Sequence, residues 1–367
     1  MATPLLVIAA GGTGGHMFPA QALAEEMLAR GWRVALATDP RGARYAGGFP
    51  AAVERRATPA ATFAQGSLLK RATAPFAIAA GAGATVLAMR RDRPAVVAGF
   101  GGYPALPAMI AARMLKIPTL IHEQNGVLGR VNRAFAPKVD LVACGTWPTP
   151  VPAGTRAVHV GNPVRAAVLD RHEATYLEPG DHPIGLLVIG GSQGAGLFGR
   201  VVPEALRLLD PAVRTRLRLS QQVRAEDMDR VRAAYEDLGM APELRTFFDD
   251  VPDRLAEASL VISRAGASSI ADITVLGRPA ILIPYAAAMD DHQAANAAGL
   301  VAAGGAFMIR EGELTADGLA GHIAAILADP EGARAMAQAS RATGRPGATE
   351  HLAALVEDLA EKGRRTA

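Results

Sequence analysis

The chain has 367 residues, 50% of them hydrophobic, so it can bury a large core and is long enough for two domains. Its formal net charge of +3 is far from the strongly basic balance typical of nucleic-acid-binding proteins. We recognise no signal peptide and no uncharged run of about 18 apolar residues, so we expect neither secretion nor a membrane span. Cys144 is the single cysteine and cannot form an intramolecular disulfide, which fits a reducing cytoplasm.

Short apolar runs alternate with longer amphipathic stretches over the first 160 residues. The runs predict strands, and the stretches, such as 19–30 and 105–115, predict helices. This alternation is typical of βαβ units that build a parallel sheet. The predicted strands are Leu5–Ala9, Arg33–Thr38, Ala95–Ala98, Thr119–His122, Leu141–Ala143 and Ala157–Val160.

The same pattern restarts after a polar stretch between Asn162 and Pro183. We therefore predict an α/β protein of two Rossmann-like domains, whose parallel sheets face each other across a cleft. The domains are expected at 1–162 and 163–344, followed by a C-terminal helix in 345–367 that could pack back on the first domain. The predicted strands of the second half are Ile184–Ile189, Arg216–Ser220, Leu260–Ser263 and Ala280–Pro284.

Three glycine-rich loops each follow a predicted strand and precede a predicted helix, at 11–16 (GGTGGH), 99–103 (GFGGY) and 190–196 (GGSQGAG). Glycine lets the backbone approach an anion closely, and a helix start supplies N–H groups and the positive end of the helix dipole. Any one loop could be a tight turn without a ligand, but three in one chain favour anion binding.

A nicotinamide dehydrogenase is the obvious alternative, because its GxGxxG fingerprint also joins a strand to a helix. In the first loop, however, Met17 occupies the position of the third glycine. Gly194, Gly196 and Gly199 match the fingerprint but begin four residues late. Asp210 has the spacing of the ribose-binding acid, yet it lies in LLDP, which is typical of a helix end. The sequence therefore disfavours dinucleotide binding.

Seven motifs follow one another along the chain: GGTGGH with FP, FGGYPALP, HEQN (122–125), GNPVR (161–165), GGSQGA, SRAGASS and DDHQAANA. Their order and spacing resemble the MurG family, the N-acetylglucosaminyltransferases of peptidoglycan synthesis. The resemblance implies a GT-B fold with the donor on the C-terminal domain, and the acceptor and the membrane on the N-terminal domain. It also implies inverting transfer of N-acetylglucosamine from UDP-N-acetylglucosamine to lipid I, undecaprenyl-pyrophosphoryl-N-acetylmuramoyl-pentapeptide, without a cofactor or metal.

The resemblance further implies a peripheral enzyme on the cytoplasmic face of the inner membrane. Its expected partners are UDP-N-acetylglucosamine, lipid I, an anionic membrane surface and other cell-wall synthesis proteins, with no nucleic acid. Two other functions stay open. One is a GT-B transferase with a different sugar nucleotide or lipid acceptor, and the other is a non-catalytic nucleotide-sugar- or lipid-binding member of a cell-wall complex.

The resemblance also implies which residues bind the donor. Arg165 matches a residue near the diphosphate, although an ordinary salt bridge is its alternative role. Asp272 stands where the family usually has a glutamate that holds the ribose hydroxyls, and it is one methylene shorter. Phe248 matches a position whose backbone reads the uracil, or it is a core phenylalanine. Gln293 matches a glutamine that contacts the donor sugar. The other implied contacts are Thr13, Gly14, Gly15, Asn125, Ser192, Ala267, Ser268, Ser269, Ile270 and Ala271.

Inversion in one step needs a general base for the acceptor hydroxyl and a group that stabilises the leaving diphosphate. We predict His16 as the base, because imidazole titrates near neutrality, with Glu123 as the second candidate. A histidine that only shapes the loop is the alternative. Asp227 and Asp229 have metal-site spacing but lie in a charged helical segment, so no metal site is predicted. Helix N-termini and Arg165 would take the place of a metal.

Residues 63–94 combine apolar and cationic side chains and are the predicted membrane surface. A core helix with a solvated basic end is the alternative interpretation. The cationic residues are Lys70, Arg71, Arg90, Arg91 and Arg93, opposed by Asp92 alone, and the apolar ones are Leu68, Leu69, Phe76 and Ile78.

Overall fold

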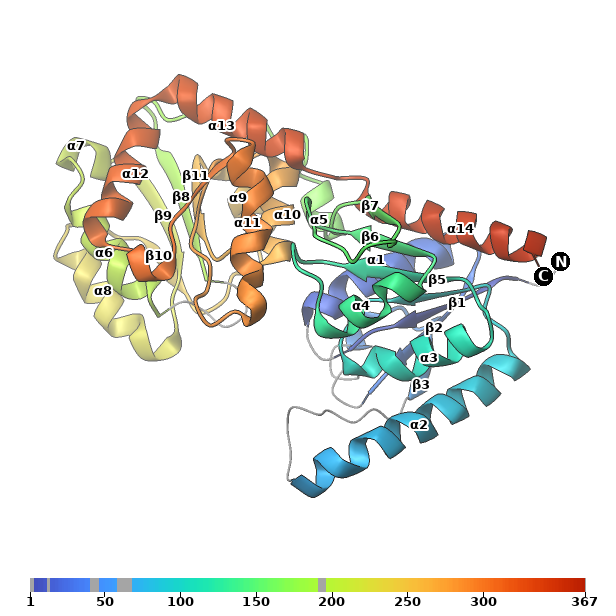
Figure 1. Ribbon diagram of the computed structural model, residues 1–367. Helices are drawn as coiled ribbons and strands as arrows, with labels where there is room; N and C mark the ends of the chain where they lie inside the picture. The colour runs from blue at the N-terminus through green and yellow to red at the C-terminus, as the bar shows by residue number, and fades with distance from the viewer. Residues whose placement is uncertain (1–2, 12–13, 40–45, 58–67, 191–195, 367) are drawn as a thin grey trace. The chain divides into compact units, whose positions relative to one another are not determined.

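The structure, a computed structural model, describes residues 3–11, 14–39, 46–57, 68–190 and 196–366, without the side chains of 14, 46, 57, 68–79 and 366. The chain divides into two compact units (Figure 1). Unit 1 comprises Met1–Val164 and Gly347–Ala367, and unit 2 comprises Arg165–Pro346. Each unit is an α/β fold around one parallel sheet, which confirms the predicted pair of Rossmann-like sheets.

The sheet of unit 1 has seven parallel strands in the order β3-β2-β1-β4-β5-β6-β7. Its central strands are buried on both faces, as expected for a parallel sheet covered by helices on each side. The edge strand β3 was not predicted, because its sequence ERRA has no apolar pattern. The strands are β1 (Leu5–Ala9), β2 (Arg33–Thr38), β3 (Glu54–Ala57), β4 (Val96–Gly99), β5 (Thr119–Glu123), β6 (Leu141–Cys144) and β7 (Ala157–His159).

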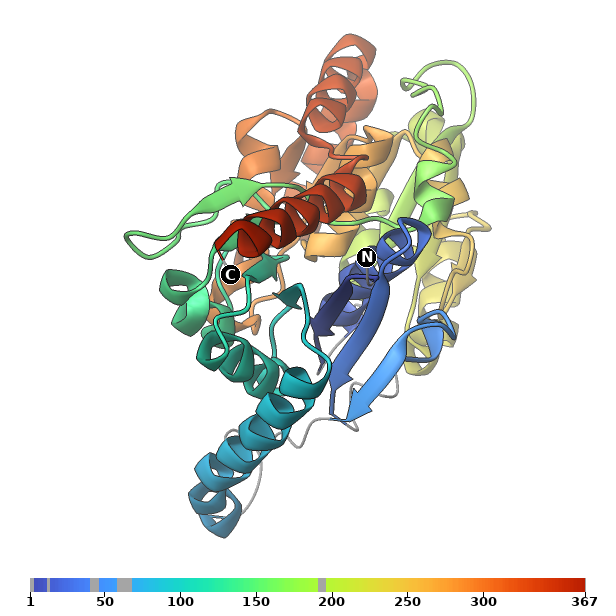
Figure 2. The same cartoon turned by 90° about the vertical axis from the view of Figure 1, so that its right-hand side faces the viewer.

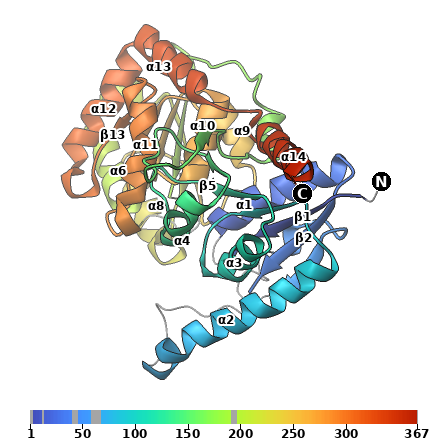
Figure 3. The same cartoon turned by 45° about the vertical axis from the view of Figure 1, so that its right-hand side comes forward.

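Alternating residues of β1 feed the two cores of unit 1. Leu6 and Ile8 pack in the core under α1 (Gly14–Ala29), whereas Leu5 and Val7 pack in the core under α3 (Leu106–Met114). Figures 1 and 3 show α1 and α3 on opposite faces of the sheet. α1 begins five residues before the predicted start, so the first glycine loop runs directly into a helix. The remaining elements of unit 1 are η2 (Ala46–Gly48), α2 (Leu68–Arg91), η3 (Tyr103–Ala105), α4 (Arg130–Phe135) and η4 (Ala136–Lys138).

The C-terminal helix α14 (Ala348–Thr366) belongs to unit 1, although the chain reaches it from unit 2. Its Leu352 and Val356 are fully buried in the same core as Leu23 of α1. Figure 2 shows this helix, at the red end of the chain, lying along the unit that contains the N-terminus. Arg30 at the end of α1 donates to Glu357 across 2.7 Å. The helix thereby closes one face of the first sheet.

Unit 2 repeats the topology of unit 1, with six parallel strands in the order β10-β9-β8-β11-β12-β13. Both sheets therefore place their first strand centrally and add strands on either side in the same sequence. The short edge strands β10 and β13 were not predicted. The strands are β8 (Ile184–Ile189), β9 (Leu217–Gln222), β10 (Glu243–Arg245), β11 (Leu260–Ser263), β12 (Ala280–Leu282) and β13 (Ala306–Met308).

Helices cover both faces of the second sheet, and α12 packs with α6 over its larger core. Within the described part of the chain, no helix is long and apolar enough to cross a membrane. The helices of unit 2 are α5 (Ala166–Leu169), α6 (Phe198–Arg207), α7 (Pro211–Arg214), η5 (Ala225–Asp227), α8 (Met228–Glu236), α9 (Val251–Glu257), α10 (Ala267–Leu276), η6 (Met289–Asp291), α11 (His292–Ala302), η7 (Glu311–Glu313), α12 (Ala316–Ala328) and α13 (Pro330–Thr343).

Candidate functional site

The strand order of unit 1 reverses direction between β1 and β4, and two glycine loops lie at the carboxyl ends of these strands. Open parallel sheets bind ligands at such a switch point. Gly101 and Gly102 of the second loop have φ values of +94° and +77°, which non-glycine residues rarely adopt. A Cβ atom on Gly102 would lie 2.6 Å from the carbonyl oxygen of Gly11. The fold therefore brings the first two predicted loops into contact.

His16 lies in the first turn of α1 and is half-buried beside the second glycine loop. Its Nδ1 lies 3.0 Å from the carbonyl oxygen of Gly11. Because a carbonyl only accepts, Nδ1 carries the ring proton in this bond and Nε2 carries the lone pair. Burial lowers the pKa of His16 below its usual value, against the opposing effects of the Glu123 charge and the Gly11 bond. The geometry thus presents a neutral imidazole with a basic Nε2.

Glu123 ends β5 and is 1% exposed. Its Oε1 accepts from the backbone N–H and the side-chain amide of Asn125, at 3.1 and 3.2 Å. Its Oε2 accepts from the N–H of Gly129 at 2.9 Å and from Nδ2 of Asn132 at 2.8 Å. Both carboxylate oxygens are thus occupied by uncharged donors. This arrangement suits a residue that organises the loop after β5 better than one that removes a proton from a substrate.

Two other residues of the HEQN motif, Gln124 and His122, make structural contacts. Gln124 donates to the carbonyl oxygen of Phe100 at 3.1 Å and thereby joins the ends of β4 and β5. Asn162 donates to the carbonyl oxygen of Gln124 at 3.0 Å. His122 is fully buried, its Nε2 lies 3.2 Å from the carbonyl oxygen of Gly161, and burial lowers its pKa to about 4.

The switch point of unit 2 lies between β8 and β11, where the third glycine loop and α10 begin. Gln222 at the end of β9 connects the surrounding segments. Its Oε1 accepts from the N–H of Gly190 at 3.2 Å, and its Nε2 donates to the carbonyl oxygen of Thr246 at 3.0 Å. Gln222 was not predicted as a site residue, since an isolated glutamine at a strand end gives no sequence signal. The predicted residues Thr13 and Ser192 lie outside the described residues.

Arg165 and Asp272 form an ion pair, with Nη2 3.3 Å from Oδ2. The Asp272 side chain is only 13% exposed, and it lies in the second turn of α10, whereas Arg165 is half-exposed. Burial raises the pKa of Asp272 to about 6, and the Arg165 charge and hydrogen bond oppose this rise. The two predicted donor-binding residues are therefore adjacent, and Arg165 makes the salt bridge that was its alternative role.

The first residues of α10 are Ala267, Ser268, Ser269 and Ile270, which are exposed or half-buried. The backbone N–H groups of the first turn of a helix lack acceptors within the helix. They therefore present a partial positive charge at the carboxyl end of β11, as an anion site requires. Ala271 is also half-buried and directly precedes Asp272.

Phe248 is a core residue, 2% exposed, and the guanidinium of Arg254 lies 4.2 Å from its ring centroid. Its side chain is thus used for packing, and only its backbone is left for the predicted uracil contact. The preceding Phe247 is 69% exposed in the same loop after β10. An exposed phenylalanine at the carboxyl end of a strand could stack on a planar ring, and the sequence pattern alone did not single it out.

Gln293 lies in the first turn of α11, and its Oε1 accepts from the N–H of Tyr285 at 2.9 Å. Asn296, one turn further along, is buried and donates to the carbonyl oxygen of Ala265 at 3.0 Å. Asn296 therefore cross-links α11 to the loop after β11. Gln293, by contrast, is only half-buried.

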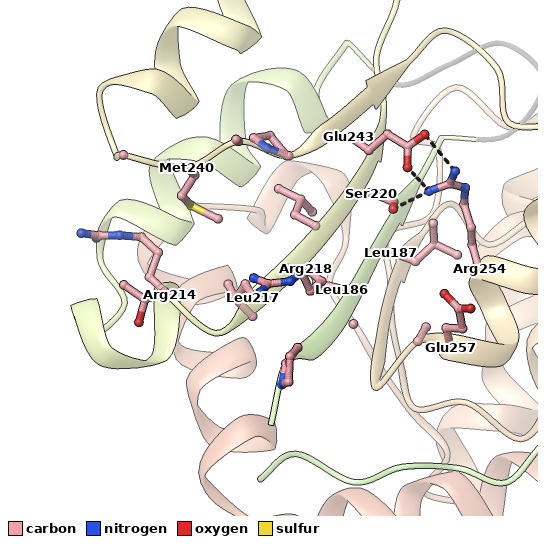
Figure 4. A pocket seen from close by; sticks show the side chains of 18 residues that line it. Leu186, Leu187, Arg214, Leu217, Arg218, Ser220, Met240, Glu243, Arg254 and Glu257 are labelled. Atoms are coloured by element: carbon pink, nitrogen blue, oxygen red, sulfur yellow. Dashed lines mark hydrogen bonds and ion pairs between the residues drawn. The ribbon is translucent and has the colours of Figure 1, made fainter. Parts of the chain in front are cut away.

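A pocket of about 600 Å³ lies elsewhere in unit 2, between β8, β9, β10 and α9 (Figure 4). It reaches Pro183 and Thr215, which precede the amino ends of β8 and β9. Inside it Arg254 donates to Ser220 at 2.7 Å and to Glu243 at 2.6 Å, so its cation is already neutralised. Since ligands bind at carboxyl ends in such sheets, we do not assign this pocket to the donor.

The described residues contain no group of three or more His, Cys, Asp or Glu side chains that could hold a metal ion. Asp227 pairs with Arg230 at 2.8 Å and lies at the start of α8, as the charged pattern predicted. Asp210 accepts from the N–H of Ala212 at 2.7 Å and caps α7, so it is a helix cap and not a ribose ligand.

The predicted membrane segment forms α2, and its C-terminal end is exposed and cationic. Arg90, Arg91 and Arg93 are exposed, while Asp92 pairs with Arg33 at 2.7 Å and with Arg56 at 2.8 Å. The single acid is thus neutralised by arginines from β2 and β3, which leaves the cationic end of α2 unbalanced. Phe63 lies outside the described residues, as do the side chains of Leu68, Leu69, Lys70, Arg71, Phe76 and Ile78.

Comparison with known proteins supports the family resemblance seen in the sequence motifs. Residues 6–144 match the Glycosyltransferase family 28 N-terminal domain, and residues 185–352 match the Glycosyltransferase family 28 C-terminal domain. The UDP-N-acetylglucosamine–N-acetylmuramyl-(pentapeptide) pyrophosphoryl-undecaprenol N-acetylglucosamine transferase of Chelativorans sp. is 47% identical, over 98% of this chain and 96% of its own length. The transferase of the same name from Caulobacter vibrioides is 49% identical, over 97% and 99%. The crystal structure of Acinetobacter baumannii MurG superposes with a TM-score of 0.82 at 29% identity, over 97% of this chain and 99% of that chain.

Proposed function

This chain belongs to the MurG family of glycosyltransferases, and we propose that it transfers N-acetylglucosamine from UDP-N-acetylglucosamine to the 4-hydroxyl of N-acetylmuramoyl-pentapeptide on undecaprenyl diphosphate. The observation that carries this proposal is near-half identity to transferases of that activity over almost the whole chain. The presence of family-matched residues at the switch points of both sheets supports it.

Unit 2 is the proposed donor side. Arg165 and the N–H groups at the start of α10 would bind the diphosphate, and Asp272 would accept hydrogen bonds from the ribose hydroxyls. The backbone at Phe248 would read the uracil, and Gln293 would contact the sugar. Ser192 and the loop around it would add donors to the diphosphate.

The Arg165–Asp272 ion pair means that the free enzyme holds these two groups against each other. Donor binding would replace this contact, because a diphosphate is a stronger partner for a guanidinium than one carboxylate. Asp272 would then have ribose hydroxyls as hydrogen-bond donors in place of Arg165. The shorter aspartate side chain is compatible with this exchange, because the Asp272 side chain is still 13% exposed.

Unit 1 is the proposed acceptor side. His16 Nε2 would remove the proton of the acceptor hydroxyl while the sugar is transferred. Glu123 would act as a positioning residue, because its carboxylate fixes Asn125 and Asn132 in the loop after β5. Gly14 and Gly15 would approach the donor during transfer, together with Thr13. The two glycine loops would bind the lipid I diphosphate through backbone N–H groups.

The leaving UDP would be stabilised by Arg165 and by helix N-termini instead of a divalent cation. This proposal predicts that transfer proceeds at the same rate with and without EDTA. The measurement is transfer of radiolabelled N-acetylglucosamine to a short-chain lipid I analogue. A strict requirement for a divalent ion would contradict the proposed charge stabilisation.

The same assay decides between the proposed function and its alternatives. A panel of sugar nucleotides would identify a transferase with another donor, because UDP-N-acetylglucosamine would then be the poorer substrate. Normal binding of UDP-N-acetylglucosamine without any transfer would instead favour a non-catalytic member of a cell-wall complex. We expect rapid transfer from UDP-N-acetylglucosamine and from no other sugar nucleotide in the panel.

We further propose that the enzyme works as a peripheral protein on the cytoplasmic face of the inner membrane. The acceptor carries a polyprenyl chain, so the enzyme must reach a bilayer. The exposed cationic end of α2, formed by Arg90, Arg91 and Arg93, would approach anionic lipid headgroups. The half-exposed Leu87 on the same helix would add apolar contact.

A further inference from the structure

The segment between β12 and α11 leads into Gln293 in the first turn of α11, and its shape decides which end of that side chain is presented. The N–H of Tyr285 donates to Gln293 Oε1 at 2.9 Å. The side-chain oxygen is therefore used inside the segment. The amide nitrogen Nε2, which has two N–H donors, is the end that can reach a ligand.

A partly buried ion pair between Arg264 and Glu311 holds the beginning of this segment. Oε2 of Glu311 accepts from the N–H of Ala286 at 3.0 Å and from Nη1 of Arg264 at 2.8 Å. The same Arg264 nitrogen lies 3.3 Å from the carbonyl oxygens of Ile283 and Pro284. Arg264 is 8% exposed. Its guanidinium therefore fixes the carbonyl groups of the segment, and Glu311 fixes both the guanidinium and the next N–H group.

The carboxylate of Glu311 is held in its ionised form. Burial alone would raise its pKa, but the hydrogen bonds from Ala286 and Arg264 lower the pKa below its usual value. Removing the carboxylate would leave a buried guanidinium without its charged partner. Replacing it by an amide would keep an oxygen acceptor in the same place.

A second ion pair holds the end of the segment. Asp290 and Asp291 have φ values of 54° and 51°, a left-handed conformation that non-glycine residues adopt rarely. Two such residues in succession persist only where neighbouring contacts hold them. Arg310 donates to Oδ2 of Asp291 at 3.0 Å. Arg310 and Glu311 are adjacent in sequence, so one short stretch after β13 holds both ends of the segment that leads into Gln293.

We propose that Arg264, Arg310 and Glu311, here called the positioning cluster, determine recognition of the donor sugar by holding Gln293 with its Nε2 directed at a sugar hydroxyl. The inference rests on the proposed function, in which Gln293 contacts the sugar. In this proposal the three residues act on Gln293 and not on the donor. They are positioning residues, and their loss weakens binding of the sugar moiety while binding of the nucleotide persists.

The test compares the affinities for UDP and UDP-N-acetylglucosamine by calorimetry in the wild type and in variants at Glu311. In E311A we expect affinity for UDP-N-acetylglucosamine to fall about tenfold and affinity for UDP to change less than about twofold. In E311Q the retained oxygen should restore affinity for UDP-N-acetylglucosamine to within about threefold of the wild type. The matched control is E313A, which removes an exposed carboxylate from the same short helix.

Equal losses for UDP and UDP-N-acetylglucosamine in E311A, or no loss for either, would overturn the inference. If E311A does not fold, R310A serves instead, because the Arg310–Asp291 pair is half-exposed. R310A should weaken UDP-N-acetylglucosamine about threefold and spare UDP, and an unchanged ratio would overturn the inference. A wild-type enzyme that binds no UDP-N-acetylglucosamine would refute the proposed function itself, so the wild-type titration separates the two failures.

Discussion

The two units share one topology but build chemically different sites at their switch points. In unit 1 the site consists of glycine backbone and a neutral imidazole, and the Glu123 carboxylate is satisfied by four uncharged donors. In unit 2 the corresponding place holds an ion pair, Arg165 with Asp272, at the start of a helix. Topology therefore provides the location of both sites, and the side chains decide what each can do.

This difference matches the two halves of the proposed reaction. A group that removes a proton near neutral pH must be uncharged before it acts, and burial of His16 provides that state. A group that stabilises a departing diphosphate must be charged throughout, and a guanidinium provides that. Four experiments test the contrast between a neutral and an ionic site, from the largest expected effect to the smallest.

The largest effect is expected for H16A. Loss of the proposed general base should lower kcat about 100- to 10,000-fold, while the KM for UDP-N-acetylglucosamine changes little because the proposed donor site is on unit 2. The measurement is steady-state transfer to a lipid I analogue. Glu123 is the comparison, since E123Q keeps an oxygen acceptor in the loop and should retain more activity than H16A. Near-wild-type turnover of H16A would remove the imidazole from the mechanism.

The second effect concerns the stability of unit 1. The pKa of His122 is about 4 in the fold against 6.5 in the unfolded chain, so the unfolded state binds more protons between these values. The stabilisation that neutral His122 contributes to the folded state is fully present above pH 6.5 and is lost as the pH falls toward 4. The total loss in the free energy of unfolding is about 3 kcal/mol.

The chain's two tryptophans, Trp32 and Trp147, both lie in unit 1, so their fluorescence follows its unfolding in urea. H122Q keeps a donor for the Gly161 carbonyl oxygen but does not titrate in this range. Its stability should therefore fall less between pH 7 and pH 4 than that of the wild type. Parallel pH profiles of the two proteins would show that His122 is not held neutral.

The third effect concerns the ionic site of unit 2. R165A removes the proposed partner of the diphosphate and should weaken binding of UDP roughly 10- to 100-fold. It also removes the charge that opposes the rise in the pKa of Asp272, so that pKa should move above its value of about 6. R171A, which breaks a surface pair with Asp253, is the matched control. Unchanged UDP affinity in R165A would show that Arg165 does not bind the diphosphate and only forms the ion pair with Asp272.

The smallest effect concerns the exterior of unit 1. Each arginine near an anionic membrane contributes about 1 kcal/mol, so R90A should weaken binding to phosphatidylserine vesicles about fivefold at low salt. Cosedimentation measures this binding, and R232A on the exposed face of α8 is the control. Binding that is insensitive both to R90A and to salt would refute an electrostatic role for this end of α2.

The sequence predicted the buried strands well and the edge strands poorly. The predicted bounds of β1, β2, β8 and β11 agree with the structure, because long apolar runs mark strands buried on both faces. The edge strands that were missed, β3, β10 and β13, have only three or four residues, and β3 and β10 also mix polar with apolar positions. The fourth edge strand, β7, was predicted. The conformation of the missed strands comes from pairing with a neighbour that the local pattern does not reveal.

For the candidate sites, the motifs indicated the segments that hold the candidate residues but not the interactions that each side chain makes. Arg165 and Asp272 were both predicted, yet nothing in the motifs indicated that they pair with each other across 107 residues of sequence. Glu123 was predicted as a possible base, and only its hydrogen bonds show that its oxygens are already occupied. Glu311 was not predicted, because a lone glutamate in a short exposed stretch gives no signal.

The sequence by itself determined what depends on local order: glycines at strand ends, apolar periodicity, and seven motifs in a fixed succession. Glycine permits left-handed backbone wherever it occurs, and an apolar run is buried in any parallel sheet. Only the tertiary structure decided the tautomer of His16, the occupied oxygens of Glu123 and the ion pairs of Arg165 and Glu311. Protonation and hydrogen bonding depend on which distant groups the folded chain brings within about 3 Å, and chain order alone does not specify those distances.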